Sequence, residues 1–325
     1  MARIFSLKPR TLYHWYRNHL SGYTPDKESG AWHPRYLENI DMETGEVTRG
    51  KPLYVFKPDN VGERMSVDDK EIGHEGFTIL SNADTGRIAM MVESCQSEEV
   101  GAAISLFGAD LQRVKSISCD MAAGYLLECS EQLPLARVVI DKFHVMQYVY
   151  NAVLDVRRRI KKELSSGLTR GKVKTPQDKE VLFQLDLLGQ TGYRLTQPAH
   201  KWSNAGRELM NTVFCSHPQL KAAYDLAQEF RQWYAVENIS RKDRPSITAD
   251  LHQWYGKVVG SEPDELRSTL KMIRKHEDEV INYFICGQTN AKAERINGKI
   301  YRFISNNYGI KDKGFALYRA ALYFS

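Results

Sequence analysis

The sequence predicts an α/β fold whose sheet is followed by a long all-helical region. Residues 65–140 alternate short apolar strands with amphipathic helices, in the order strand–strand–strand–helix–strand–helix–strand. The later strands are continuous apolar runs, which is typical of parallel strands buried on both faces. From about residue 178 to 285, apolar and aromatic residues recur at helical spacing without strand alternation.

Each element of the predicted sheet region has its own signal. Two apolar runs flank the turn residues Asp84-Thr85-Gly86, which predicts a pair of strands. Ser97 is a suitable N-cap for the next helix, because an apolar stripe begins at Val100. The expected strands are 65–69, 77–83, 87–93, 114–119 and 136–140, and the expected helices are 97–111 and 121–133.

The chain is expected to divide into four parts. Residues 1–60 are aromatic, basic and irregular, with one helix at 11–23 and a hairpin turn at 41–51, and they are a candidate DNA-contacting region. A polar, basic loop at 165–179 separates the sheet region from the helical one. The expected parts are 1–60, an N-terminal region; 61–164, the first part of the α/β core; 165–287, a helical insertion; and 288–325, the last helices of the core.

Composition indicates an intracellular globular protein. The 325 residues are 42% hydrophobic and 26% charged, and no apolar run is long enough to span a bilayer. The N-terminal residues lack an apolar signal segment, so we expect no secretion. Five scattered cysteines without a CxxC pair argue against a disulfide framework or a zinc module and suit a reducing cytoplasm. The net charge of +5 is modest, but the basic residues are clustered.

Three acids fall at places where they can converge. Asp68 lies in the first strand, Asp120 ends the fourth, and Glu294 lies on a late helix. If the first and fourth strands are neighbours, these side chains meet at one edge of the sheet. Carboxylate oxygens are the ligands that Mg²⁺ and Mn²⁺ prefer, and a pair of such ions activates a nucleophile at a phosphodiester. The acids therefore predict a site for two Mg²⁺ or Mn²⁺ ions.

Each acid also has an ordinary explanation. An aspartate that ends a strand is commonly a turn or cap residue, and Glu294 has Lys292 and Arg295 as close neighbours in a basic helix. Asp69 follows Asp68, but successive strand residues point to opposite faces, so only one of the two faces the site. The order and strand positions of the three acids together favour the metal site.

Asp141 and His144 form a second acidic feature, after the fifth strand. Asp141 is either a metal ligand itself or a support for a site whose ligands lie elsewhere. Because the fourth strand supplies the second ligand in the expected order, the support role is favoured. Asp141 would then cap the following helix or orient the imidazole of His144, and His144 would brace an active-site acid or contact the substrate.

Two basic segments are candidate DNA-binding surfaces. A run in the helix after Asp141 is either a solvated helix face or a surface for the phosphate backbone, and its place after a candidate active-site strand favours phosphate. The late helix carries a basic face at a spacing of three or four residues. The predicted DNA-binding residues are Arg157, Arg158, Arg159, Lys161, Lys162, Lys292, Arg295, Lys299 and Arg302.

The motifs around these residues resemble those of a known family. Asp68 is followed by a stretch with His74 and Gly76, Asp120 precedes Met121 and a helix, and "DKFHV" begins at Asp141. The late helix has an Asn–Glu–Asn pattern before a Tyr–Gly pair. The segments that carry this resemblance are "SVDDKEIGHEGFTILSNADTGRI", "SISCDMAAGYLLECSEQLPLARVVIDKFHV" and "TNAKAERINGKIYRFISNNYGIKD", with Asn290, Glu294, Asn297, Tyr308 and Gly309 in the last. The chain resembles the DDE transposases of bacterial insertion sequences, of the ISL-three type, over about residues 60 to 325.

The resemblance implies an RNase H-like mixed sheet flanked by helices and interrupted by an all-α insertion before the last catalytic helix. It implies metal-dependent strand cleavage at the ends of the element, followed by strand transfer into target DNA, on a homo-oligomer in the bacterial cytoplasm at the nucleoid. Lys142 replaces the arginine usual in the family's "DRFHV" motif, and Asp69 replaces a glutamate beside the first acid. The family's Cys-rich or helix-turn-helix DNA-binding region is missing from residues 1–60, so we expect a separately encoded DNA-binding protein, or a chain that is a fragment.

Two other functions remain open at this stage. An RNase H-like nuclease would use the same acids to cut DNA without joining it. A domesticated, catalytically idle transposase would only bind DNA, although the intact acids argue against decay.

Overall fold

A computed structural model provides the fold of the chain. It describes residues 7–21, 23, 36–40, 45–72, 74–168, 175–235, 237, 239, 243–288, 291–305 and 313–324. At a few of these positions, among them Lys292 and Glu294, only the backbone is described.

The chain divides into two compact units. The sheet unit comprises Met1–Asp141 together with Gln288–Ser325, and the helical unit comprises Lys142–Gly287. The chain therefore leaves the sheet unit directly after Asp141 and returns to it at Gln288.

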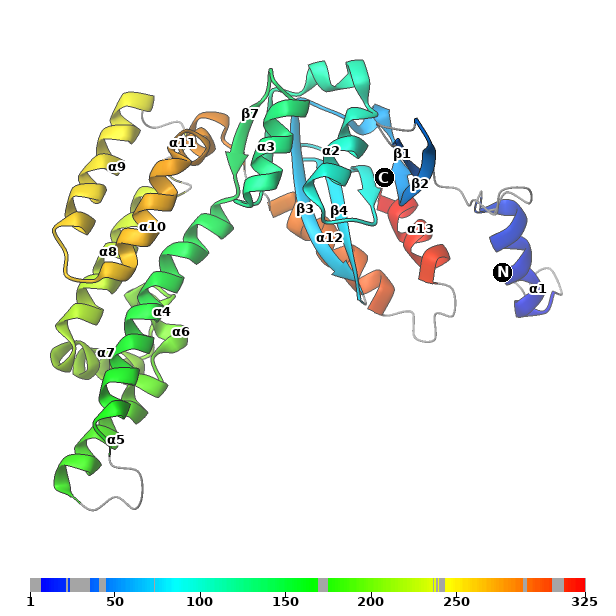
Figure 1. The fold of residues 1–325 in the computed structure, drawn as a ribbon. Coiled ribbons are helices and arrows are strands. Elements are labelled where there is room, and N and C mark those ends of the chain that lie inside the picture. Colours follow the sequence, from blue (N-terminus) through cyan, green and yellow to red (C-terminus); the bar gives the residue numbers. More distant parts are fainter. Residues whose placement is uncertain are drawn as a thin grey trace. The chain divides into compact units, whose positions relative to one another are not determined.

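Among its described residues, the sheet unit contains seven strands in the order β1-β2-β5-β4-β3-β6-β7. Strands β3, β4 and β5 pair antiparallel, whereas β3, β6 and β7 pair parallel. This mixed sheet, flanked by helices, confirms the predicted RNase H-like fold (Figure 1). Its elements are α1 (Pro9–Trp15), β1 (Tyr36–Ile40), β2 (Val47–Phe56), β3 (Arg64–Ile72), β4 (Glu75–Asn82), β5 (Ile88–Val92), α2 (Ser97–Ser105), β6 (Ser116–Cys119), α3 (Ala123–Gln132), β7 (Arg137–Ile140), α12 (Ala291–Ser305) and α13 (Lys313–Phe324).

All five strands expected from the sequence are present, with small differences at the ends. Strand β3 runs on to Ile72, since its antiparallel pairing with β4 continues through every residue to Glu75. Helix α2 ends at Ser105, earlier than expected, and Gly108, with a φ of 53°, follows in a 3-10 turn. That left-handed backbone conformation favours glycine and does not continue a helix.

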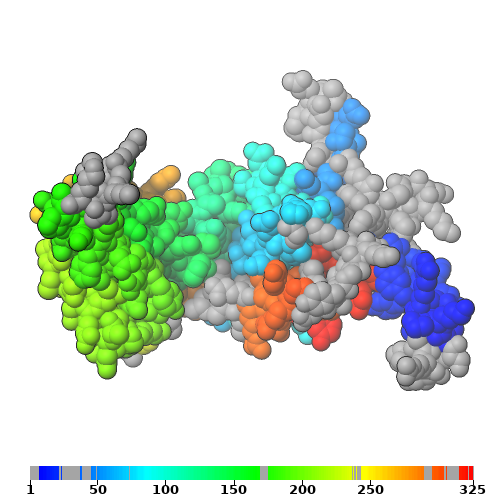
Figure 2. Space-filling view, turned by 90° about the horizontal axis from the view of Figure 1, so that it is seen from below, coloured from blue at the N-terminus to red at the C-terminus, as the bar shows by residue number. Residues whose placement is uncertain are grey.

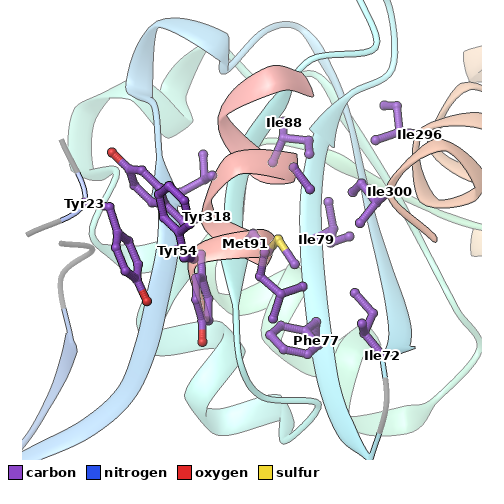
Figure 3. Packing of buried hydrophobic residues seen from close by; sticks show 14 residues of the cluster. Tyr23, Tyr54, Ile72, Phe77, Ile79, Ile88, Met91, Ile296, Ile300 and Tyr318 are labelled. Atoms are coloured by element: carbon purple, nitrogen blue, oxygen red, sulfur yellow. The ribbon is translucent and has the colours of Figure 1, made fainter. Parts of the chain in front are cut away.

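Helices cover both faces of the sheet. Helices α2 and α3 lie on one face, and α12 and α13 on the other (Figure 1). On the second face, Ile296 and Ile300 of α12 pack toward Ile79 of β4, in a cluster that also takes in Phe77 and Phe315 (Figure 3). Burial of these aliphatic and aromatic side chains attaches α12 to the sheet, at about 25 cal/mol for each Å² of apolar surface removed from water.

The N-terminal elements extend the sheet. Strands β1 and β2 pair antiparallel with Ile40 opposite Val47, so the expected hairpin is present, although residues 41–44 at its turn lie outside the described residues. The expected helix is α1, continued by a π-helical turn at Tyr16–Leu20. Tyr13 and Tyr16 contact the ring of Phe315 edge-on, so this segment packs against α13.

The helical unit has an aromatic core. The ring of Phe230 contacts those of Trp233, Tyr234 and Trp254 at centroid distances of 5.2, 5.6 and 4.8 Å. Among the described residues, no helix combines the length and the apolar character needed to cross a membrane. The helices are α4 (Lys142–Ser166), α5 (Pro176–Gly189), α6 (Gly192–Leu195), α7 (Asn204–Ser216), α8 (Pro218–Trp233), α9 (Arg244–Val259), α10 (Asp264–Lys275) and α11 (Glu277–Cys286).

Candidate active site

Three aspartates lie level with one another on adjacent parallel strands: Asp68 within β3, Asp120 directly after β6 and Asp141 directly after β7. Ser66 of β3 is opposite Ser118 of β6, and Cys119 of β6 is opposite Ile140 of β7. Continuing both registers places Asp68 beside Asp120, and Asp120 beside Asp141. The backbone N–H of Asp141 donates to the carbonyl oxygen of Cys119 at 2.9 Å, so the alignment of β6 and β7 continues to this point. Adjacent strands are about 4.8 Å apart, so Asp141 is about twice as far from Asp68 as Asp120 is.

The side chain of Asp68 points to the face covered by α12. Its cross-strand partner on β4 is Ile79, which packs against α12. Asn297 of α12 donates a hydrogen bond from Nδ2 to Oδ2 of Asp68 at 2.5 Å. Alternation along the strands directs Asp120 to the same face as Ser116 and Ser118, which is the face of Asp68.

Asp69 points to the opposite face, as the pleat requires. Its Oδ1 accepts hydrogen bonds from the hydroxyls of Thr78, at 2.7 Å, and Tyr125, at 2.6 Å. Burial of this oxygen raises the pKa of Asp69, and the nearby charge of Asp120 adds to the rise, while the two hydroxyls oppose it. Because Tyr125 lies on α3, Asp69 ties β3 to the helices of the other face.

Asp120 and Asp141 differ in their surroundings. Asp120 is partly buried, and its Oδ1 accepts the backbone N–H of Met121 at 2.5 Å, at the turn that leads into α3. Asp141 is only 7% exposed and is the last residue of its segment of the sheet unit. His144 belongs to the helical unit, in the first turn of α4, and is partly buried. The structure thus brings Asp68, Asp120 and Asp141 together at one edge, within a single unit, and places His144 in the other.

Glu294 lies on α12, three positions before Asn297. Residues three apart on a helix share a side, so Glu294 and Asn297 belong to the same side of α12. The side chain of Glu294 lies outside the described residues, as does that of Lys292. The buried residues Ile296, Asn297 and Ile300 show that this part of α12 packs on the sheet next to Asp68.

The donor set suits a hard divalent cation. Asp68 and Asp120 provide carboxylate oxygens on adjacent strands, and two like charges this close are costly unless a cation neutralises them. Among the side chains that the structure describes, no three His, Cys, Asp or Glu residues form a metal site. The third carboxylate predicted from the sequence is that of Glu294, whose side chain is not among those described.

The basic run on α4 is largely engaged within the helical unit. Arg157 donates from Nε to the carbonyl oxygen of Leu188, at 2.7 Å, and from Nη2 to that of Gly189, at 3.0 Å, so it caps the C-terminal end of α5. Arg159 pairs with Glu265 at 2.7 Å. Arg158 is exposed and pairs with Asp155 on the same helix. Of the two lysines in this run, Lys161 is partly buried and Lys162 is exposed.

The basic residues of α12 lie on a more open surface. Arg295 and Arg302 are exposed, and Lys299 is partly buried. The ammonium group of Lys299 lies 5.8 Å from the centre of the Phe324 ring. Figure 2 shows the surface of α12 (orange) beside the strands of the sheet unit (cyan).

Two side-chain amides, those of Asn297 and Gln288, contact the strands near the acids. Sequence patterns predicted no role for either of them. Asn297 was part of the family pattern, but its contact with Asp68 depends on how α12 packs. Gln288 is 3% exposed and hydrogen-bonds to β3 and β6. Its only sequence signal is its position, just before the helix that carries Glu294.

A mixed RNase H-like sheet whose adjacent parallel strands carry aspartates at the same level is typical of proteins that process nucleic acids. Residues 65–321 match a family described as transposase, the DDE transposases of the ISL-three type, and the chain belongs to that family. No curated protein matches the chain.

Proposed function

We propose that this transposase cleaves DNA strands at the ends of its insertion sequence and joins the freed ends to target DNA. The observation that carries the proposal is the row of acids: Asp68 and Asp120 lie level on β3 and β6, and Asn297 ties the helix of Glu294 to Asp68. Membership of the transposase family supports DNA as the substrate.

Three carboxylates would hold the metal ions of this family, Mg²⁺ or Mn²⁺. The residues are Asp68, Asp120 and Glu294. When bound, two such ions would neutralise negative charge at the phosphodiester, activate the attacking oxygen and stabilise the leaving oxygen. Asn297 donates to Asp68 and thereby restricts the orientation of that carboxylate. We assign Asp141 and His144 to supporting roles, because Asp141 lies one strand further from Asp68 than Asp120 does.

The chemistry consists of two displacements at phosphorus. In the first, the oxygen of water forms a bond to phosphorus, the bond to the 3′ oxygen breaks, and the proton lost by water is balanced by the proton gained at that oxygen. In the second, the freed 3′-hydroxyl attacks a phosphodiester of target DNA, and a target 3′-hydroxyl leaves. Both steps need the attacking and leaving oxygens in line, which requires the carboxylates to be held in place.

We propose that the exposed basic residues contact the phosphate backbone. On α4 these are Arg158 and Lys162, and on α12 they are Arg295 and Arg302. Such contacts position DNA without reading its sequence. Recognition of the element ends would then need a base-reading partner, which we propose is a separately encoded DNA-binding protein acting with a homo-oligomer of this chain.

A strand-transfer assay tests the proposal. Oligonucleotides that carry the inverted repeats flanking the reading frame are incubated with the chain, Mg²⁺ and a target plasmid, with and without the protein of any short neighbouring reading frame. We expect cleaved ends and joined products. Asp68→Asn should abolish both, whereas its neighbour Asp69→Asn, which removes the same charge on the opposite face, should retain most of the activity.

Each other outcome has a definite meaning. Cleavage without joining identifies an RNase H-like nuclease, and binding without cleavage identifies an idle, domesticated protein. An inactive Asp69→Asn protein together with an active Asp68→Asn protein would show that the wrong face has been assigned to the site.

A further inference from the structure

The side-chain amide of Gln288 hydrogen-bonds to β3 and β6, the strands that position Asp68 and Asp120. Its Nε2 donates to the backbone carbonyl oxygen of Met65 on β3, at 2.5 Å, and to Oγ of Ser118 on β6, at 3.1 Å. Its Oε1 accepts from the hydroxyl of Ser116 at 2.6 Å. The side chain thus uses both donors and accepts one hydrogen bond, and it joins two adjacent strands of the sheet unit.

The strands provide a floor of small residues for this amide. Ser66, Ser116 and Ser118 are each at most 3% exposed. Ser66 is opposite Ser118, and alternation directs these serines to the same face as Asp68 and Asp120. Larger side chains here would keep a glutamine from reaching the backbone of β3. The contacts of Gln288 therefore lie two to four residues before Asp68 and Asp120 on the same strands.

Glu294 lies between two such anchors. Gln288 precedes it and is hydrogen-bonded to Met65, and Asn297 follows it and is hydrogen-bonded to Asp68. Both anchors are nearly buried, at 3% and 4% exposure, and both attach to β3. The segment that carries the third acid is consequently held at each end against the strand that carries the first.

We propose that Gln288 is a positioning residue for the metal site, and that its amide sets where α12 begins on β3 and β6 and so places Glu294 within reach of Asp68 and Asp120. This inference rests on the proposed function, in which Glu294 is the third acid. Apolar packing of Ile296 and Ile300 holds α12 on the sheet, but such packing is not directional. The amide of Gln288 fixes the position of this segment along the strands, because its three hydrogen bonds require a specific alignment.

A positioning role predicts an effect on metal binding and chemistry out of proportion to any loss of stability. A displacement of about 1 Å at a reacting centre costs about 100-fold in rate. A purely structural role predicts only a less stable protein with an unchanged site. The two roles therefore separate in a comparison with another buried amide of the same sheet.

Asn82 is that control. It is 7% exposed, its Nδ2 donates to the carbonyl oxygen of Asn60 at 3.0 Å, and its Oδ1 accepts from the backbone N–H groups of Asp84 and Thr85. It holds the turn between β4 and β5, and alternation directs it to the face opposite Asp68. The variants are Gln288→Met, which keeps the length without the amide, and Asn82→Leu.

The experiment measures three quantities on the full chain: the Mn²⁺ affinity without DNA, by electron paramagnetic resonance; the single-turnover cleavage rate at saturating DNA and Mg²⁺; and the DNA affinity. For Gln288→Met we expect Mn²⁺ affinity about 10-fold weaker and cleavage about 10- to 100-fold slower, with DNA affinity within about threefold of the parent. Asn82→Leu should lower the melting temperature, measured as a stability control, and leave these three quantities, per folded molecule, near those of the parent.

A gentler variant covers the case in which Gln288→Met does not fold. Ser116→Ala removes one of the three hydrogen bonds and leaves Gln288 itself, so it should shift Mn²⁺ affinity and cleavage in the same direction by a smaller factor. Parental Mn²⁺ affinity and cleavage in both Gln288→Met and Ser116→Ala would overturn the inference. Changes in Gln288→Met that only match those of Asn82→Leu would overturn it as well.

Failure of the proposed function has a different signature. If the parent chain binds Mn²⁺ but neither cleaves nor joins DNA, the proposed activity fails, and the Mn²⁺ affinities of the variants still decide the role of Gln288. If the parent chain binds no Mn²⁺, both ideas fall together.

Discussion

The two units differ in what they remove from water. Among the described residues, the sheet unit buries ten polar or charged side chains, whereas the helical unit buries two, Thr191 and Thr269. Several of the ten lie under the acids, including Ser66, Ser116 and Ser118. Both units bury aromatic rings, and in the helical unit rings dominate the core, with Phe230 and Tyr234 fully buried and Trp254 only 4% exposed.

The difference separates a unit built for a site from one built for stability. A buried polar group costs free energy unless it is hydrogen-bonded, so a sheet rich in such groups depends on their partners. Buried rings stabilise through area and need few partners. In the helical unit the indole N–H groups of Trp202 and Trp254 donate to the backbone carbonyls of Arg194 and Leu226. We therefore expect variants of the sheet unit to affect activity most, and variants of the helical unit to affect stability most.

The largest expected effect is at Asp120. Asp120→Asn removes a ligand charge and keeps the shape, so cleavage and joining should fall by at least about 1,000-fold, roughly 4 kcal/mol of transition-state stabilisation, with unchanged folding and DNA binding. Asp141→Asn should lose only part of the activity. Strand-transfer assays with circular dichroism as the folding control make the comparison. An inactive but folded Asp141→Asn protein beside an active Asp120→Asn protein would make Asp141 the second catalytic acid.

A variant in the core of the helical unit should lose stability and keep its metal affinity. Phe230→Ala removes a ring that contacts Trp233 and Trp254, and a cavity of this kind costs about 3–5 kcal/mol. Urea unfolding followed by tryptophan fluorescence measures it, because Trp202, Trp233 and Trp254 all belong to this unit. Mn²⁺ affinity, per folded molecule, should stay near that of the parent. A large loss of Mn²⁺ affinity at full folding would break the contrast between the units.

Neighbouring arginines of α4 sharpen the comparison inside the helical unit. Arg157→Ala removes the cap of α5 and should lower stability by about 1–3 kcal/mol. Arg158→Ala alters an exposed residue, so stability should change by less than about 1 kcal/mol. If Arg158 contacts a phosphate, the slope of log affinity against log salt should fall by about 0.9 for duplex DNA. An unchanged slope would show that Arg158 only faces solvent.

The smallest effect concerns acid stability. Burial lowers the pKa of His217, which lies between α7 and α8, because the charged imidazole is disfavoured there. Above pH 6.5 the histidine is neutral in both the folded and unfolded states, and as the pH falls below that value the unfolded state takes up a proton that the folded state resists. Stability should therefore decline with acid, and His217→Gln should decline less between pH 6.5 and 5. If the parent and His217→Gln lose equal stability between pH 6.5 and 5, His217 is not the cause of the decline.

Local patterns were enough to predict the sheet and the placement of two acids. The strands show β-type apolar runs bounded by turn residues, and the opposite orientation of Asp68 and Asp69 follows from the pleat alone. The level alignment of Asp68 and Asp120 follows once β3 and β6 are neighbours.

Contacts made over long sequence separations were beyond those patterns. Gln288 lies 223 residues from Met65, and Asn297 lies 229 from Asp68, so no periodicity connects them. The basic run on α4 shows the same limit. A row of arginines predicts charge, but only the packing of α5 against α4 shows that Arg157 is used to cap a helix.

The separation between Gln288 and Met65 also affects the timing of synthesis. At about 5–20 residues per second, a ribosome needs on the order of 10–45 s to pass from Met65 to Gln288, 223 residues later. Once Asp120 has been added, the nascent chain carries Asp68 and Asp120 but still lacks Gln288, Glu294 and Asn297. On our proposal, a chain that is still being translated, or that is truncated before α12, cannot cut the DNA that encodes it.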